Sequence, residues 1–158
     1  MAKINKTNAM RILDAQKIEH NVLEYKADDG KIDGISVAKK IGRSMESVFK
    51  TLVLKGNSDK VYVAVVPVER EVNLKKLANE VGEKRIVPIH VNEILSITGY
   101  IRGGCSPIGM KKKYETIIDK SVKNNDMVIV SGGKIGLQIE LHHDDLIKLT
   151  EARVIDIT

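Results

Sequence analysis

Two separated segments carry residues whose types and spacing can act on an anion or a carbonyl group. Residues 99–113 place several glycines and Pro107 directly before three consecutive lysines, and residues 47–53 place Lys50 within an otherwise apolar strand pattern. Glycines let a ligand approach backbone N–H groups closely, and lysines supply positive charge. The sequence therefore predicts a site for an anionic ligand, assembled from distant parts of the chain.

Lys50 is the more informative of these cations. Lysines avoid protein interiors, yet this one lies next to Phe49 and two residues before Leu52. Strand alternation puts Lys50 and Leu52 on one face, with Thr51 and Val53 on the other. Two interpretations stay open: an outward lysine that discourages edge-to-edge aggregation, or a pocket cation that holds a carbonyl oxygen, a carboxylate or a phosphate.

Cys105 is a candidate nucleophile because it lies in the glycine-rich segment near Arg102 and Lys111. Convergence of these cations would lower the thiol pKa. No general base is evident beside Cys105, however, and a single cysteine in a tight turn is more often a packing residue. Ser106, which precedes Pro107, is interpreted as a turn residue.

Other polar clusters are open to two interpretations each. His142 and His143 precede Asp144 and can bind a metal, but neighbouring residues at a helix start usually cap the helix, which is the interpretation we favour. The glycines after Ser131 indicate a hairpin turn that also allows close ligand approach. The run of Lys111, Lys112 and Lys113 is either a solvated face or a contact for a phosphate backbone. A Walker loop, a G-x-G-x-x-G motif, a nucleophile elbow and a zinc-type Cys/His spacing are all missing from the sequence.

Composition limits the classes of protein to consider. The 158 residues suit one domain, and the net charge of +5 favours a polyanionic partner. Only 3% of residues are aromatic, so stacking platforms for single-stranded nucleic acid are not expected. A single cysteine fits a reducing compartment, and no signal peptide or membrane-spanning run is visible, so we expect a soluble cytoplasmic protein without membrane contact.

The patterns alternate between short helices and short strands. We expect helices that follow Thr7, that begin at Ser36 and end at Gly42, and that cover residues 74–82, 92–99 and 145–149. We expect strands at residues 21–25, 50–55, 61–66, 85–88, 114–118, 127–130, 135–141 and 153–157, the second and third forming an antiparallel hairpin. The sequence thus predicts a single α+β domain over residues 1–158, with a mixed, curled β-sheet flanked by short helices.

Five motifs in this order and spacing resemble the YbaK family of free-standing aminoacyl-tRNA deacylases. They are FKTLV at 49–53, NLKK at 73–76, TGYIRGG at 98–104, SPIG at 106–109 and VSGGK at 130–134. The family is similar to the editing domain inserted in bacterial prolyl-tRNA synthetases, and its Cys-tRNA(Pro) deacylase branch is the most similar. The resemblance implies hydrolysis of mischarged Cys-tRNA(Pro), assisted by the substrate thiol. It implies neither a cofactor nor a metal, and it adds prolyl-tRNA synthetase as a partner.

The resemblance also implies the site residues. Lys50 takes the catalytic position, and residues at pocket positions of the family are Tyr25, Thr51, Arg70, Gly103, Ser131 and Gln138. The residue at the Gln138 position varies within the family, and Gly103 is expected to contribute backbone atoms. Two alternatives stay open: a deacylase for another misacylated tRNA such as Ala-tRNA(Pro), and a non-catalytic module that binds tRNA or a synthetase.

Overall fold

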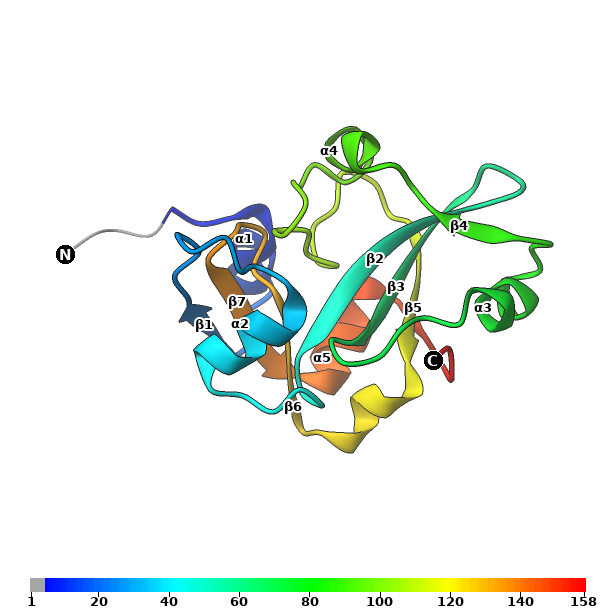
Figure 1. The fold of residues 1–158 in the computed structure, drawn as a ribbon. Coiled ribbons are helices and arrows are strands. Elements are labelled where there is room, and N and C mark those ends of the chain that lie inside the picture. Colours follow the sequence, from blue (N-terminus) through cyan, green and yellow to red (C-terminus); the bar gives the residue numbers. More distant parts are fainter. Residues whose placement is uncertain (1–4) are drawn as a thin grey trace.

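The computed structural model describes residues 5–158 and arranges them as short helices and strands around two β-sheets (Figure 1). The helices are α1 (Asn8–Ala15), α2 (Gly34–Ile41), α3 (Leu74–Val81), α4 (Ile94–Thr98) and α5 (His143–Thr150), with two 3-10 helices, η1 (Val91–Glu93) and η2 (Lys120–Asn124). The strands are β1 (His20–Glu24), β2 (Phe49–Gly56), β3 (Val61–Pro67), β4 (Ile86–Pro88), β5 (Glu115–Asp119), β6 (Met127–Ser131), β7 (Leu137–His142) and β8 (Arg153–Ile155).

The strands divide between a five-stranded and a three-stranded sheet. The larger sheet has the order β4-β2-β3-β5-β8, and the smaller sheet has the order β1-β7-β6. β3 pairs with β5 and β5 pairs with β8 in parallel, whereas the other ladders are antiparallel. The predicted mixed α+β class and the hairpin of β2 and β3 are therefore confirmed, and the predicted sheet is split in two.

The two sheets meet where β2 begins. Val48 forms a parallel bridge with Ile129 of β6, and the Ile129 amide donates a hydrogen bond to the Ser47 carbonyl at 2.8 Å. Beyond this point β2 leaves β6 and runs to β4, which pairs only with Leu54, Lys55 and Gly56. Residues 49–52 pair with β3 along one edge, whereas their other edge lies between β6 and β4 and pairs with neither strand over most of its length.

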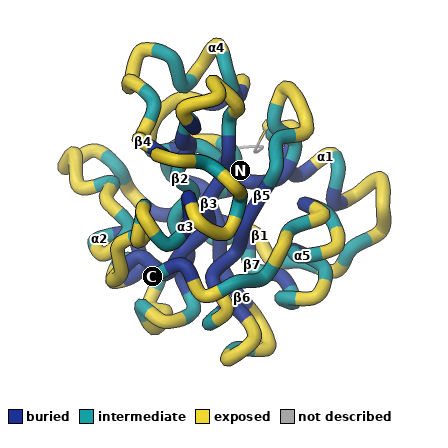
Figure 2. Tube along the Cα trace, turned by 90° about the vertical axis from the view of Figure 1, so that its right-hand side faces the viewer, coloured by how far each residue is buried: buried dark blue, intermediate teal, exposed yellow. Residues whose placement is uncertain are grey.

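Aliphatic side chains fill the space on both faces of the larger sheet. On one face Phe49, Val63 and Val65 pack against Ile139 and Leu141 of the smaller sheet, with α1 and α5 closing the cluster. On the other face α3 covers a second cluster formed by β2, β3 and β4. Figure 2 shows the buried backbone concentrated in these central strands, with exposed loops around them. No helix among residues 5–158 is long and apolar enough to cross a membrane.

Side-chain caps define several of the predicted helix starts, although α4 begins at Ile94 without a side-chain cap and α5 begins at His143, two residues earlier than predicted. Thr7 accepts a hydrogen bond from the Met10 amide, and Asn73 caps α3 in the same way. Helix α2 begins at Gly34, earlier than predicted, because Asp33 accepts the Ser36 amide at 3.1 Å and is the cap. Ser36 therefore lies inside the first turn of the helix that it was expected to start.

A buried carboxylate ties the end of β5 to the C-terminal segment. Asp119 is 1% exposed and accepts hydrogen bonds from the Ser121 amide, the Ser121 hydroxyl and the Ile157 amide. Removing an acceptor from buried donors leaves those donors without partners, which costs about 1–3 kcal/mol for each group.

We therefore expect Asp119→Ala to lower the free energy of unfolding by about 2–4 kcal/mol, because two backbone amides lose their acceptor. Urea denaturation followed by circular dichroism measures this loss. Asp126→Ala is the matched control, because Asp126 is an exposed aspartate in the next loop and its removal should change stability by less than about 0.5 kcal/mol. Equal effects of the two substitutions would contradict the role given to Asp119.

Candidate active site

The edge of β2 that faces away from β3 borders a cavity of about 300 Å³, which we call the site cavity. Four consecutive residues of β2, from Phe49 to Leu52, contribute to its wall. Because side chains alternate between the faces of a strand, four in a row can line one cavity only where the strand edge itself borders it. The other walls come from the start of α2, the loop before Cys105, and the paired ends of β6 and β7: Ile32, Asp33, Gly34, Val37, Val48, Val68, Arg102, Gly103, Cys105, Ser131 and Gln138.

The ladder register shows which backbone groups face this edge. Lys50 pairs with Val66, and the Gly56 amide donates to the Lys60 carbonyl, so even-numbered residues of β2 turn their backbone groups toward β3. Odd-numbered residues turn theirs toward β4, as the Ile89 amide bonded to the Val53 carbonyl confirms. No strand in the described part of the chain pairs with Thr51 on that side. Its N–H and C=O groups are therefore free to bind a ligand.

Thr51 also presents a side-chain hydroxyl to the same region. Its Oγ1 atom is buried and has no hydrogen-bond partner among residues 5–158. A buried hydroxyl without a partner costs free energy that a bound polar group can recover. Thr51 thus offers a bound molecule a backbone donor, a backbone acceptor and a hydroxyl.

Lys50 reaches the cavity from the α3 side of β2 and forms an ion pair. Its Nζ atom lies 3.1 Å from Oε1 of Glu71, and the Lys50 side chain is only 23% exposed while that of Glu71 is 88% exposed. The carboxylate is therefore well solvated, and exposed pairs of this kind add little stability. The ammonium is held at the cavity by a partner that a ligand can replace.

The ends of β6 and β7 supply two more polar side chains. Ser131 and Gln138 are opposite each other in the ladder, and Gln138 is buried. The Ser131 Oγ accepts the Gly133 amide at 3.3 Å, which leaves its hydroxyl proton free to donate. The structure therefore brings together Lys50, Thr51, Gly103, Ser131 and Gln138 of the predicted set.

Two members of the predicted set lie elsewhere. Tyr25 follows β1 and lines a shallower depression of about 720 Å³ with Lys40 and Lys134, and its hydroxyl is buried without a partner among the described residues. Arg70 is exposed and lines a small depression beside η2. Ile135 lines the depression at Tyr25 and lies close to Gly103 of the site cavity, where an added Cβ would be 3.4 Å from its Cγ1 atom.

The three consecutive lysines do not form one continuous patch. Lys111 donates to the Ser96 carbonyl at 3.4 Å, beside α4, whereas Lys113 forms an ion pair with Glu151 at 2.6 Å. Lys112 is exposed and lines a small depression near the end of α5. Only Lys111 therefore lies next to the elements around the site.

Cys105 lines the site cavity, but its environment favours the neutral thiol. Burial raises its pKa to about 11, although a hydrogen bond with Thr98 acts in the opposite direction. A neutral thiol is a poor nucleophile, which fits the packing interpretation. The turn interpretation of Ser106 is also supported, because its buried Oγ accepts the Ile108 amide.

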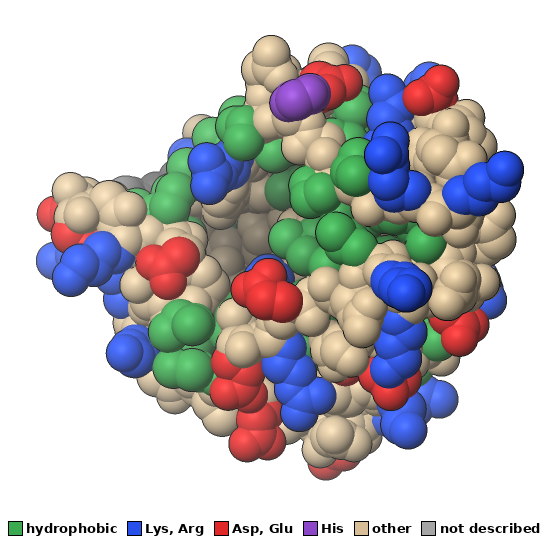
Figure 3. Space-filling view, turned by 45° about the vertical axis from the view of Figure 1, so that its right-hand side comes forward, with side chains coloured by type: hydrophobic (Ala, Val, Ile, Leu, Met, Phe, Trp, Pro, Cys, Tyr) green, Lys and Arg blue, Asp and Glu red, His purple; other side chains and the backbone are tan. Residues whose placement is uncertain are grey.

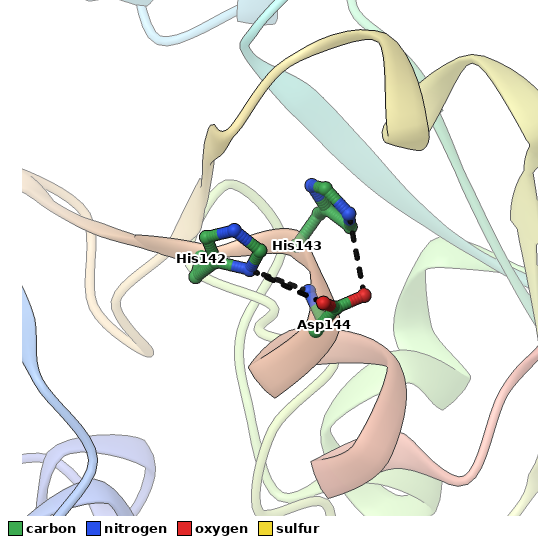
Figure 4. Close-up of side chains that lie close together, drawn as sticks. All are labelled: His142, His143 and Asp144. Atoms are coloured by element: carbon green, nitrogen blue, oxygen red, sulfur yellow. Dashed lines mark hydrogen bonds and ion pairs between the residues drawn. The ribbon is translucent and has the colours of Figure 1, made fainter.

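His142 caps α5, and Figure 4 shows the side chains of His142 and His143 beside Asp144 at the start of this helix. His142 Nδ1 accepts the Asp144 amide at 3.1 Å, and His143 Nδ1 lies 2.7 Å from the Asn125 carbonyl. The donor atoms of the two histidines and Asp144 all lie within 4.8 Å of one another. This cluster is at the end of β7 opposite to Gln138, and therefore lies outside the site cavity.

The sequence analysis did not place Glu71 beside Lys50 or Asp33 in the cavity wall. Glu71 reaches Lys50 only because the chain turns back after Pro67, and Asp33 arrives with α2 from a separate part of the fold. Neither position has a periodic signal in the sequence. The register of the β2–β3 hairpin places Lys50 opposite Val66. It does not fix the path of residues 67–70, which lead from Val66 to Glu71.

Comparison with known proteins identifies the family. The family model of the aminoacyl-tRNA editing domain matches residues 34–149. EbsC of Enterococcus faecalis, a protein named for a Cys-tRNA(Pro)/Cys-tRNA(Cys) deacylase activity, is 40% identical over 153 residues, which are 97% of this chain and 93% of EbsC. The proline–tRNA ligase of Brachyspira hyodysenteriae is 31% identical over 91 residues, or 58% of this chain and 16% of the ligase.

Solved structures share the fold. A protein described as a trans-editing enzyme for prolyl-tRNA synthetase superimposes with a TM-score of 0.82 at 22% identity, covering 98% of this chain and 99% of that one. The hypothetical protein APE2540 superimposes with a TM-score of 0.86 at 22% identity, covering 96% and 99%. These two likenesses concern the fold, whereas the family match and the identity to EbsC concern the sequence. The chain belongs to the aminoacyl-tRNA editing domain family.

Proposed function

We propose that the protein is an aminoacyl-tRNA deacylase that hydrolyses the ester joining cysteine to the 3′ end of proline tRNA. The observation that carries this proposal is the position of the Lys50 ammonium at a small cavity that also presents free backbone groups of Thr51. Membership of the editing family and the 40% identity to EbsC support the same activity. Correctly charged tRNA carries proline, which lacks a thiol. The enzyme can therefore distinguish Cys-tRNA(Pro) from Pro-tRNA(Pro) by the reactivity of the thiol as well as by the size of the amino acid.

Lys50 is assigned the catalytic role. Ester cleavage passes through a tetrahedral oxyanion, which positioned N–H donors and a cation stabilise without a protein nucleophile. The Lys50 ammonium and the edge amide of Thr51 are suited to this task, together with backbone groups at Gly103. Ser131 and Gln138 are assigned to the amino-acid part of the substrate. Tyr25 and Arg70, which line other depressions, stay predictions as substrate contacts.

The substrate thiol is assigned the role of nucleophile. Its sulfur bonds to the ester carbonyl carbon, the bond from that carbon to the ribose oxygen breaks, and the ribose oxygen takes up the thiol proton. The cysteine leaves as a four-membered thiolactone, which one water molecule opens to free cysteine. This sequence needs no protein nucleophile, and it matches a cavity whose own thiol is held neutral.

The modest net charge suggests that the tRNA is delivered with help. A charge of +5 supports weak attraction to a polyanion rather than tight binding of the whole tRNA. We propose prolyl-tRNA synthetase as the partner that presents the tRNA, in the cytoplasm where the charged tRNA is made. We also propose that Lys111, Lys112 and Lys113 contact the tRNA. Residues 1–158 are proposed to form one editing domain.

Lys50→Ala is expected to lower kcat/KM for Cys-tRNA(Pro) by about 100-fold or more, because the transition state loses its cation. Release of radiolabelled cysteine from Cys-tRNA(Pro) measures the rate. Lys55→Ala is the matched control, since Lys55 is on the same strand but does not line the site cavity, and its rate should stay close to that of the wild type. If the wild type preferentially releases alanine from Ala-tRNA(Pro), the assignment of cysteine as the substrate amino acid is wrong. If the wild type releases neither amino acid, the result favours a non-catalytic tRNA-binding module.

Serine-charged proline tRNA should be cleaved at least ~10-fold more slowly than the cysteine-charged form, because a hydroxyl is a far weaker nucleophile than a thiol near neutral pH. Single-turnover hydrolysis of the two substrates under identical conditions provides the comparison. Equal rates would exclude attack by the substrate thiol while leaving the deacylase activity itself intact.

Cys105 should react slowly with iodoacetamide in the folded protein. With the pKa raised from 9.0 to about 11, the thiolate fraction at pH 8 is about 100-fold lower than in the unfolded chain. Mass spectrometry of native and urea-denatured protein measures the two labelling rates, since this is the only cysteine in the sequence. Rapid native labelling at pH 8, or a loss of about 100-fold in deacylation in Cys105→Ala, would contradict the packing role.

A further inference from the structure

A second cavity adjoins the site cavity. Its volume is about 410 Å³, and it shares five wall residues with the site cavity: Thr51, Leu52, Arg102, Gly103 and Cys105. Two spaces with five walls in common lie directly side by side. A ligand whose reactive end occupies the site cavity can therefore extend into the second cavity.

The chemistry of this second cavity differs from that of the site cavity. Most of its walls are aliphatic and come from β2, from the start of α3 with the segment before it, and from the stretch that runs from the end of β4 to the start of α4: Leu52, Val53, Leu54, Val72, Leu74, Pro88, Ile89, Val91 and Ile94. Among its described lining residues, only Glu71 and Arg102 carry a charge. Figure 3 shows the molecule hollowed on one face, with hydrophobic side chains gathered around the hollow and charged side chains at its rim.

The stretch of chain from β4 to the segment after α4 exposes an unusual share of apolar surface. Val87, Val91, Leu95 and Ile101 are 43%, 56%, 56% and 50% exposed, and they account for four of the seven large hydrophobic residues that are exposed in the described chain. All four lie within fifteen residues of sequence, but only Val91 lines the second cavity. Exposed apolar surface in a cavity wall indicates a binding region.

We infer that the second cavity binds the base of the terminal adenosine of the tRNA, an inference that rests on the proposed deacylase function. The ester and the base are attached to the same ribose, so an ester held at Lys50 brings the base into the adjoining space. Aliphatic walls suit the flat faces of a purine, and the Arg102 guanidinium can stack on the ring or meet the phosphate. We assign the preceding phosphates to the Lys111 ammonium, which lies beside α4 at the Ser96 carbonyl.

The occupant is a nucleoside rather than an apolar protein segment because of the position of the cavity. The space adjoins the cavity proposed to hold the ribose ester. Arg102 borders both cavities, has no ion pair among residues 5–158, and matches a phosphate. Glu71, the one acidic residue in the lining, is already paired with Lys50. The Glu71 carboxylate is therefore partly neutralised, and it repels an approaching anion less strongly than an unpaired carboxylate would.

Val91 and Leu95 provide a matched pair of variants for the test. Both are 56% exposed, but only Val91 lines the second cavity. Val91→Ser should raise KM for Cys-tRNA(Pro) about five- to tenfold with kcat nearly unchanged, since it weakens a contact made equally in the ground and transition states. Leu95→Ser should change neither constant by more than about twofold.

A direct binding measurement separates this inference from the proposed function. Proline tRNA that ends in 2-aminopurine in place of adenine reports the environment of the terminal base by its fluorescence. Titration with wild type and with Lys50→Ala should change the fluorescence in both cases, and Val91→Ser should weaken the response. A fluorescence change on binding supports the adenosine site even if no ester is hydrolysed. Hydrolysis by the wild type without a fluorescence change, and with an unaltered KM in Val91→Ser, would overturn it.

Discussion

The unpaired edge of β2 is the constraint on which the rest of the site depends. β2 is bridged to β6 at Val48 and paired with β4 from Leu54 onward, so residues 49–52 run between two neighbours that have separated. A strand edge leaves N–H and C=O groups without partners, and proteins normally cover or disrupt such an edge. Here the edge is covered incompletely by the glycine-rich loop and by the hairpin of β6 and β7. The remaining gap is the site cavity.

Each functional group at this gap is held by a different part of the fold. The β2–β3 ladder fixes Lys50 and Thr51, and the β6–β7 ladder fixes Ser131 opposite Gln138. The ion pair of Lys50 with Glu71 joins an enclosed cation to an exposed carboxylate, which a substrate can replace at small cost. The site thus combines rigid backbone positions with one exchangeable contact, as a site that must admit and release a large substrate requires.

Local pattern was sufficient for most of the elements and for singling out Lys50, whereas the catalytic assignment of Lys50 came from the family resemblance. Caps such as Thr7 and Asn73, and the β-branched run of β3, follow from properties that a short window of sequence contains. Lys50 was identifiable because a lysine interrupts an apolar strand. The division into two sheets was not predictable, since it depends on where β2 leaves β6. The position of Glu71 against Lys50 depends on a loop path that no periodicity encodes.

The structure of the protein bound to a cysteine amide analogue of 3′-cysteinyl adenosine tests the central claim most directly, because the amide resists cleavage. The account predicts that the analogue carbonyl oxygen lies about 3 Å from Nζ of Lys50, next to the edge of β2, with the base in the adjoining aliphatic cavity. An analogue bound instead in the larger depression beside Tyr25, with the gap between β2 and β6 left unfilled, would contradict it.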